Sequence, residues 1–84
     1  MDIEKKVREL IEKPINDLGY ELKSVIYVEE DGVYFLRVII DSSKTICVED
    51  CVTVTRLIDP MLDDVDYIKD SYILDVCSFE KGSD

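Results

Sequence analysis

Apolar residues recur every three or four positions at the start of the chain: Ile3, Val7, Leu10, Ile11, Ile15 and Leu18. This spacing puts them on one stripe of an amphipathic helix and predicts a helix over residues 2–18. Asp2 is a suitable N-cap, and Gly19 is expected to end the helix in a left-handed conformation. Pro14 cannot donate a hydrogen bond to the carbonyl of Leu10, so we expect a kink or a break there.

Two segments rich in β-branched and aromatic residues follow, at residues 22–28 and 33–40. Each predicts a strand, and Asp31-Gly32 between them is a strong signal for a tight hairpin. Side chains alternate between the two faces of a strand. The better core face of the second strand consists of Tyr34, Leu36, Val38 and Ile40.

Residues 48–62 carry two conflicting signals. The β-branched run at residues 52–55 favours a strand, because branched side chains lose rotamer freedom in a helix. The longer spacing favours a helix, since one helical face collects Val48, Cys51, Val54 or Thr55, Ile58, and Met61 or Leu62. Glu49 and Asp50 also suit a first helical turn. We therefore predict a helix that Pro60 distorts near its end.

Residues 72–77 predict a third strand, so the order of elements is αββαβ. A chain of 84 residues has room for one hydrophobic core. We expect a two-layer α+β fold in which two helices cover one face of a three-stranded sheet.

The net charge of the chain limits the kinds of molecule that it is expected to bind. The chain has 20 acidic residues, 10 basic residues and no histidine, for a net charge of −10. Nucleic acids and anionic membranes attract Lys and Arg, so direct binding to either is disfavoured. A basic protein is the partner that this charge favours. An equally supported interpretation is that the acidic residues serve only to keep the protein soluble. No signal peptide or membrane span is apparent, which favours a cytoplasmic location.

The three cysteines, Cys47, Cys51 and Cys77, are an odd number in a chain without secretory features. A disulfide framework is therefore improbable. Two thiols four residues apart, with no histidine, also fall short of a closed zinc site. We interpret the three residues as small, buried apolar side chains.

Carboxylates are the remaining candidates for chemistry. Asp41 and Asp75 border apolar segments, but turn formation explains Asp41, and a solvent-facing or edge position explains Asp75. Asp63, Asp64 and Asp66 could gather Mg²⁺ or Ca²⁺, although a solvated connection explains them more simply. We predict no catalytic residue, no metal site and no cofactor, and keep a small metal-dependent or catalytic domain as the rival class.

Five segments resemble, in order, the N-terminal domain of the bacterial ribosome maturation factor RimP family. They are IEKPINDLGYEL at 11–22, FLRVIID at 35–41, VEDC at 48–51, LIDPMLD at 57–63 and YILDVCS at 72–78. The resemblance implies an αββαβ fold, like the type II KH fold without its Gly-x-x-Gly loop. It also implies a non-enzymatic role in maturation of the small ribosomal subunit.

Two features depart from that family. Cys47 stands where members usually have Asn, Ser or Thr, which cap a helix better by up to ~1 kcal/mol. Members also usually continue into a second, β-barrel domain, whereas this chain reads FEKGSD after Ser78. We assign residues 1–78 to the domain and residues 79–84 to a short polar tail, with the usual C-terminal barrel absent.

The leading hypothesis is a domain that docks on the small ribosomal subunit, or on a basic ribosomal protein, through protein contacts. The candidate contact residues are Glu49, Asp50, Asp63, Asp64 and Asp66. The alternative is a structural domain that holds or orients a C-terminal partner domain.

Overall fold

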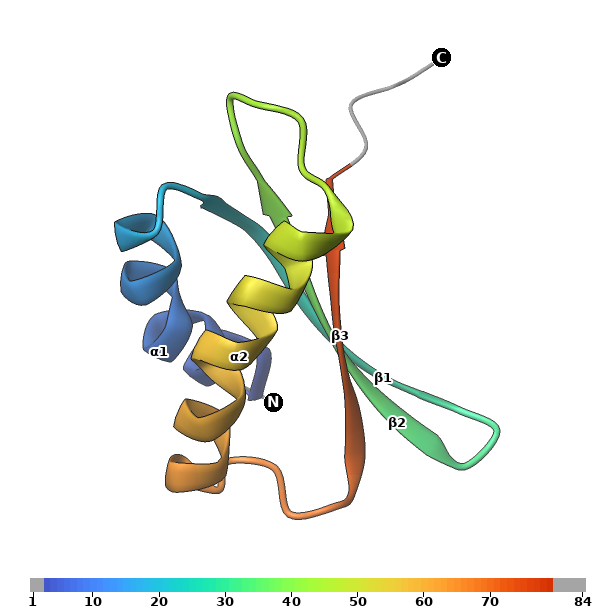
Figure 1. Cartoon of the computed structure of the whole chain (residues 1–84). Helices are drawn as coiled ribbons and strands as arrows, with labels where there is room; N and C mark the ends of the chain where they lie inside the picture. Colours follow the sequence, from blue (N-terminus) through green and yellow to red (C-terminus); the bar gives the residue numbers. More distant parts are fainter. Residues whose placement is uncertain (1–2, 80–84) are drawn as a thin grey trace.

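The computed structural model describes residues 3–79, which form two helices and three strands (Figure 1). The elements are α1 (Ile3–Asp17), β1 (Glu21–Glu30), β2 (Val33–Asp41), α2 (Val48–Val65) and β3 (Tyr72–Ser78). The predicted αββαβ order and α+β fold are confirmed. The predicted N-cap Asp2 lies outside the described residues.

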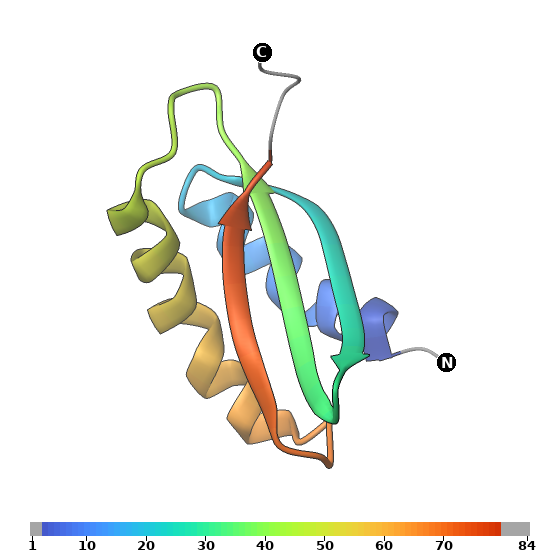
Figure 2. The ribbon, with the colours of Figure 1, turned by 90° about the vertical axis from the view of Figure 1, so that its right-hand side faces the viewer.

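The three strands form one mixed sheet in the order β1-β2-β3. β1 and β2 are antiparallel, and the turn between them has positive φ at Asp31 (53°) and Gly32 (81°), as a tight hairpin requires. β3 is parallel to β2 and is reached through α2. Both helices cover the same face of the sheet, and the opposite face is open (Figures 1 and 2).

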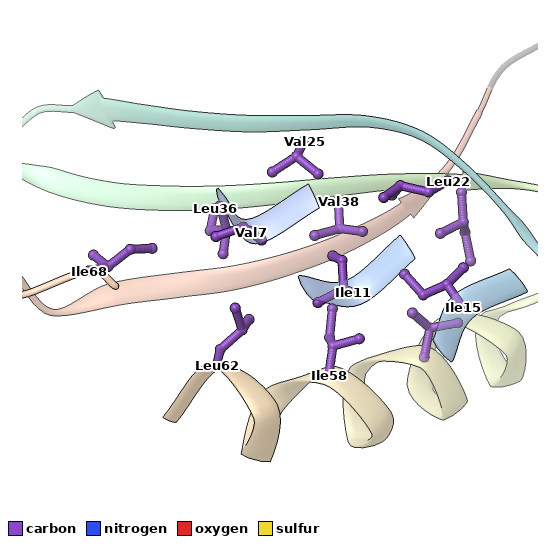
Figure 3. Packing of buried hydrophobic residues seen from close by; sticks show 12 residues of the cluster. Val7, Ile11, Ile15, Leu22, Val25, Leu36, Val38, Ile58, Leu62 and Ile68 are labelled. Atoms are coloured by element: carbon purple, nitrogen blue, oxygen red, sulfur yellow. The ribbon is translucent and has the colours of Figure 1, made fainter. Parts of the chain in front are cut away.

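The core lies between this helical layer and the sheet (Figure 3). Each helix contributes three buried side chains and β2 contributes three more: Val7, Ile11 and Ile15; Val54, Ile58 and Leu62; Leu36, Val38 and Ile40. Leu22 and Val25 of β1, with Ile68 from the α2–β3 loop, complete the cluster. The predicted core face of β2 is therefore confirmed except at Tyr34, which is only half-buried.

Two positions of the predicted helical stripes lie outside the core. Leu18 follows the last residue of α1 and is 46% exposed, and Val48 begins α2 and is 78% exposed. Val54 is the first fully buried residue of α2, and Cys51 in the preceding turn is only half-buried. Helical spacing alone does not show where along its length a helix meets the core.

Of the kink or break predicted at Pro14, the break is not observed, since both Pro14 and Pro60 lie inside continuous helices. Pro60 leaves the carbonyl of Arg56 without its helical donor, but both residues are exposed, so water can bond that carbonyl. α2 ends three residues later than predicted, at a left-handed Asp66 whose N–H donates to the Leu62 carbonyl at 3.2 Å. Gly19 has φ of 97°, as predicted for the end of α1.

The β-branched run on α2 is helical, as its longer period predicted. The hydroxyl of Thr53 donates to the Glu49 carbonyl at 3.0 Å, and that of Thr55 to the Cys51 carbonyl at 2.8 Å. Each hydroxyl thus bonds the backbone one turn earlier, which satisfies it without leaving the helix. Neither described helix is long and apolar enough to cross a bilayer.

Candidate docking surface

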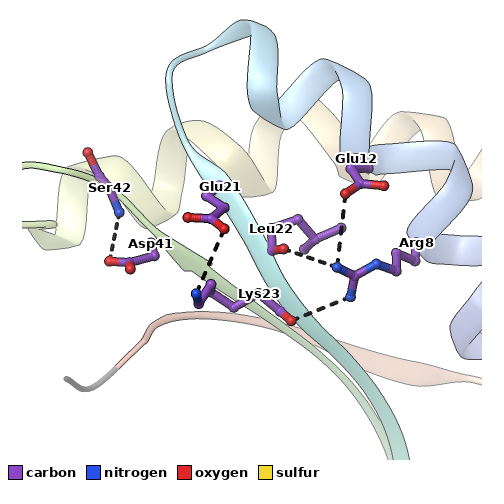
Figure 4. Close-up of polar contacts among 7 residues, drawn as sticks. All are labelled: Arg8, Glu12, Glu21, Leu22, Lys23, Asp41 and Ser42. Carbon is purple, nitrogen blue, oxygen red and sulfur yellow. Dashed lines mark hydrogen bonds and ion pairs between the residues drawn. The ribbon is translucent and has the colours of Figure 1, made fainter. Parts of the chain in front are cut away.

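Two side chains of α1, Arg8 and Glu4, bond the free edge of β1, and Figure 4 shows the contacts of Arg8. The Arg8 guanidinium donates to the carbonyls of Leu22 at 3.3 Å and Lys23 at 3.4 Å. Glu4 Oε2 accepts the backbone N–H of Tyr27 at 2.8 Å. These contacts occupy edge groups that could otherwise pair with another strand, so we look for a docking surface elsewhere.

Asp50, at the start of α2, is held by contacts within the fold. Its carboxylate accepts the hydroxyl of Tyr20, and it accepts the backbone N–H of Cys47 at 2.9 Å and the thiol of Cys47 at 3.3 Å. The Tyr20 hydrogen bond, followed by the Cys47 bonds, lowers the pKa of Asp50. The same hydrogen bond raises the pKa of Tyr20 to about 12. Asp50 therefore ties α2 to the end of α1, whereas its neighbour Glu49 is exposed.

The cysteines are less buried than predicted. Cys47 is exposed at the N-cap of α2, so its assignment as a buried side chain was wrong. The carboxylate of Asp50, three residues later, accepts the backbone N–H of this N-cap residue. Cys51 and Cys77 are half-buried, and burial raises the pKa of both thiols. Raised pKa values keep both thiols protonated near neutral pH, which makes them poor nucleophiles.

A carboxylate-lined groove lies between the second half of α2 and the start of β3. It has a volume of about 450 Å³ and is lined by Thr55, Asp59, Asp63, Ser71, Tyr72 and Leu74. Asp59 and Asp63 are four residues apart and therefore neighbours on one helical face. Burial and then the charges of these two aspartates raise the pKa of Tyr72. We call this feature the α2–β3 groove.

Asp66 lines a smaller neighbouring cavity together with Asp63 and so extends this acidic surface. Asp64 is exposed as well, but as the immediate neighbour of Asp63 on the helix it does not share a face with it. Within residues 3–79, the carboxylates of Asp59, Asp63, Asp64 and Asp66 take part in no ion pair or hydrogen bond. Asp63 and Asp64 also lie in the last turn of α2, which has no basic residue. Negative charge at a helix C-terminus opposes the helix dipole, so helix stability does not explain these residues.

The five candidate contact residues fall into two separate groups. Glu49 and Asp50 lie in the first turn of α2, while Asp63, Asp64 and Asp66 lie at its other end. Glu49 and Asp63 are separated by 14 positions (63 − 49), which corresponds to about 20 Å of helix at roughly 1.5 Å per residue. Asp59 was missed in the sequence, although its four-residue spacing from Asp63 was a usable signal. The acidic surface around the groove therefore comprises Asp59, Asp63 and Asp66.

The other carboxylates considered for chemistry have structural partners. Asp75 is opposite Arg37 in the β2–β3 register, and their side chains are 3.5 Å apart. Asp41 Oδ1 accepts the backbone N–H of Ser42 at 2.8 Å, in the turn predicted there (Figure 4). Across residues 3–79, no group of three or more His, Cys, Asp or Glu side chains is arranged to hold a metal ion.

Comparison with protein families gives a match over most of the chain. A family model described as the RimP N-terminal domain matches residues 10–79. The match begins within α1 and includes β1, β2, α2 and β3 in full, together with the whole α2–β3 groove.

Proposed function

Since the chain belongs to the RimP N-terminal domain family, a family of ribosome maturation factors, we propose that it docks on the small ribosomal subunit during maturation. Its direct partner would be a basic ribosomal protein, and the contact would involve no catalytic turnover. The setting implied by ribosome assembly in bacteria is the cytoplasm. Family membership supports the link to ribosome maturation, and the acidic surface supports the mode of docking.

The observation that carries this proposal is the set of carboxylates around the α2–β3 groove. Asp59 and Asp63 line a groove whose described lining contains no basic side chain, and Asp66 continues it. Grouped carboxylates repel one another and retain their attraction for an external cation. A partner with Lys or Arg side chains would relieve that repulsion and gain charge-assisted hydrogen bonds.

A protein partner fits this surface better than RNA. Binding to a phosphate backbone requires Lys and Arg side chains free to displace counterions. Two of the arginines are already engaged inside the fold, Arg8 with Glu12 and Arg37 with Asp75. The net charge of −10 adds general repulsion from nucleic acid.

Co-sedimentation of the chain with small-subunit particles tests the proposal. Binding should be clear at about 50 mM salt and should weaken strongly toward about 1 M, where the Debye length falls to ~3 Å. Purified ribosomal RNA should not bind under the same conditions, whereas at least one purified basic ribosomal protein should. No binding to particles at low salt, while a longer protein containing this domain binds them, would remove the role from this domain.

A charge-matched pair of variants locates the contact. Asp59→Asn/Asp63→Asn removes two charges from the groove, and Asp17→Asn/Asp31→Asn removes two at the exposed end of α1 and the hairpin tip. Exposed ion pairs contribute about 0.2–1 kcal/mol each, so the groove variant should bind about two- to thirtyfold more weakly. Equal weakening by both variants would mean that net charge matters and the groove does not.

The open face of the sheet favours a second candidate function, that of a structural domain that holds or orients another domain. Ile73 of β3 is 50% exposed on this face and lies opposite Phe35 of β2. Phe79, just after β3, is 42% exposed. Apolar side chains in such positions are suited to contact with another domain. Ile73→Ser should then loosen the arrangement of domains in the full gene product, measured by limited proteolysis, and leave particle binding by the isolated chain unchanged.

A further inference from the structure

A second cavity lies beside the start of α1, near the hairpin ends of β1 and β2. It has a volume of about 420 Å³ and is lined by Ile3, Glu4, Tyr27, Tyr34 and Asp70. This volume falls within the ~300–1,000 Å³ typical of ligand pockets. Two aromatic rings, two carboxylates and one aliphatic side chain thus converge from α1, β1, β2 and the α2–β3 loop. We call it the tyrosine pocket.

The two tyrosines form a preorganised wall. Their ring centroids are 5.4 Å apart and the rings are within 8° of parallel, so they stack. The strand register explains the stack: Tyr34 pairs with Glu29 and Leu36 with Tyr27, which places the two rings diagonally on one face. Glu4 is also fixed, because its Oε2 accepts the N–H of Tyr27. The pocket therefore exists before any ligand arrives.

The carboxylates of Glu4 and Asp70 place negative charge beside the two tyrosine rings. Burial first, and then the charge of Asp70, raise the pKa of Tyr27. Aromatic faces also carry partial negative charge and attract cations. A ring pair beside two carboxylates is thus a favourable environment for a cationic group and an unfavourable one for an anion.

The chain's own cations are placed on other rings. Among the described residues, Lys6 lies over Tyr67 at 5.7 Å, Lys23 over Phe79 at 5.0 Å and Arg37 over Phe35 at 5.4 Å. Neither ring of the stacked pair has such a contact within residues 3–79, and the described lining of the pocket contains no basic side chain. Within residues 3–79, the tyrosine pocket thus offers aromatic rings like those in the other cation–ring contacts, but no Lys or Arg side chain lies over them.

We propose that the tyrosine pocket binds an arginine side chain of a basic protein partner, an inference that builds on the proposed docking function. The planar guanidinium can stack on a tyrosine ring and direct its N–H groups to the carboxylates of Glu4 and Asp70. A lysine ammonium is a more strongly hydrated point charge and lacks the flat surface for stacking. Arginine is therefore the better match.

The position of the pocket agrees with a single extended contact. Tyr34 of the pocket pairs in register with Tyr72 of the α2–β3 groove, and Asp70 precedes Ser71 of that groove. The two cavities thus have neighbouring lining residues at the start of β3. One basic segment of a partner could place a side chain in each, so the pocket would anchor the segment and the groove would bind its neighbouring cations.

NMR titration of the 84-residue chain with acetyl-arginine-amide tests the pocket directly. The expected result is saturable shifts of the Tyr27, Tyr34 and Asp70 signals, with no comparable shifts in the first turn of α2. Acetyl-citrulline-amide, the neutral isostere, should give no saturable shifts, and acetyl-lysine-amide should bind more weakly than arginine. Equal shifts with citrulline, or shifts spread over all acidic residues, would overturn the proposal.

Variants keep the test independent of folding defects. Asp70→Asn and Glu4→Gln each remove one charge, and Gln retains an oxygen that can accept the Tyr27 N–H. Tyr34→Leu removes one ring, and Asp17→Asn is the charge-matched control at the far end of α1. Each pocket variant should weaken arginine-amide binding about two- to fivefold, and the control should not. If all four variants bind equally, the tyrosines serve only packing.

The same variants separate this inference from the proposed docking function. If the chain binds small-subunit particles and the pocket variants bind them as tightly as the parent, docking stands and the pocket inference fails. If arginine amide occupies the pocket but the chain does not bind particles, the pocket stands and the docking function fails. Weaker particle binding by the pocket variants, with Asp17→Asn unchanged, supports both.

Discussion

The two helices lie in one layer and bury three side chains each, yet they use their charges differently. α1 has four acidic and four basic residues, a net charge of 0, while α2 has five acidic residues and one basic residue, a net charge of −4. On α1, Arg8 and Glu4 bond the edge of β1. On α2, the only carboxylate with hydrogen-bond partners in residues 3–79 is that of Asp50. Charge on α1 serves the fold, and most charge on α2 remains available to a partner.

The largest expected effect tests whether the helices are equivalent in the core. Ile11 of α1 and Ile58 of α2 are both fully buried. Ile11→Ala and Ile58→Ala should each lower the free energy of unfolding by about 2–5 kcal/mol, because each leaves a cavity. Urea denaturation followed by circular dichroism measures both. A loss below about 1 kcal/mol at only one site would show that the helices do not share the core equally.

The second prediction concerns the charge that α1 uses for folding. Arg8→Met removes the donors to the Leu22 and Lys23 carbonyls but retains much of the apolar stem. The expected loss is about 1 kcal/mol, typical of a part-exposed hydrogen-bonding group. Arg56→Met is the matched change on the exposed side of α2 and should cost less than about 0.5 kcal/mol. Equal losses in urea denaturation would contradict the difference between the helices.

The elements were predictable because they depend on local periodicity, whereas the ends of the helices and the site depend on tertiary contacts. The Asp31-Gly32 turn and the helical period through Val54 and Ile58 were sufficient signals. The end of α2 was not predictable, because Asp66 adopts the left-handed conformation that usually indicates Gly or Asn.

For the site, the sequence predicted that the contact residues are acidic, but it did not predict which of them lie together in the folded chain. Asp50 is bonded to Tyr20, 30 residues earlier in the chain, and no spacing rule reveals such a partner. The tyrosine pocket joins Glu4, Tyr27, Tyr34 and Asp70 from four separate segments, so it exists only in the folded chain.

The third prediction concerns Asp50, the acidic residue of α2 whose carboxylate is hydrogen-bonded within the fold. Its lowered folded pKa means that its stabilisation is present above the unfolded value of about 3.9 and is lost as pH falls through the folded pKa. Tyr20, with a folded pKa of about 12, contributes stabilisation that is complete below about pH 10 and is lost as pH rises toward 12. The hydrogen bond between Tyr20 and Asp50 is the largest cause of both pKa shifts.

Tyr20→Phe removes that hydrogen bond and keeps the ring. The urea midpoint of the variant should lie below that of the parent between about pH 5 and 9, and the difference should shrink as pH falls below about 4 and as it rises from about 10 toward 12. Glu49→Gln, one residue away and exposed, is the control and should show no such pattern. A constant difference at every pH would mean that the ring, and not the hydrogen bond, accounts for the effect.

The smallest effects should have opposite signs on the two helices. Glu12→Gln on α1 removes a carboxylate 3.9 Å from Arg8 and should lower the free energy of unfolding by about 0.2–0.5 kcal/mol. Asp63→Asn on α2 removes repulsion from Asp59 and an unfavourable charge at the helix C-terminus, so it should raise stability by about 0.3–1 kcal/mol. Thermal melts at low salt measure both, and high salt should reduce both differences by screening. The same sign for both variants would mean that net charge alone sets stability, and that the acidic residues of α2 are not held at a cost to the fold.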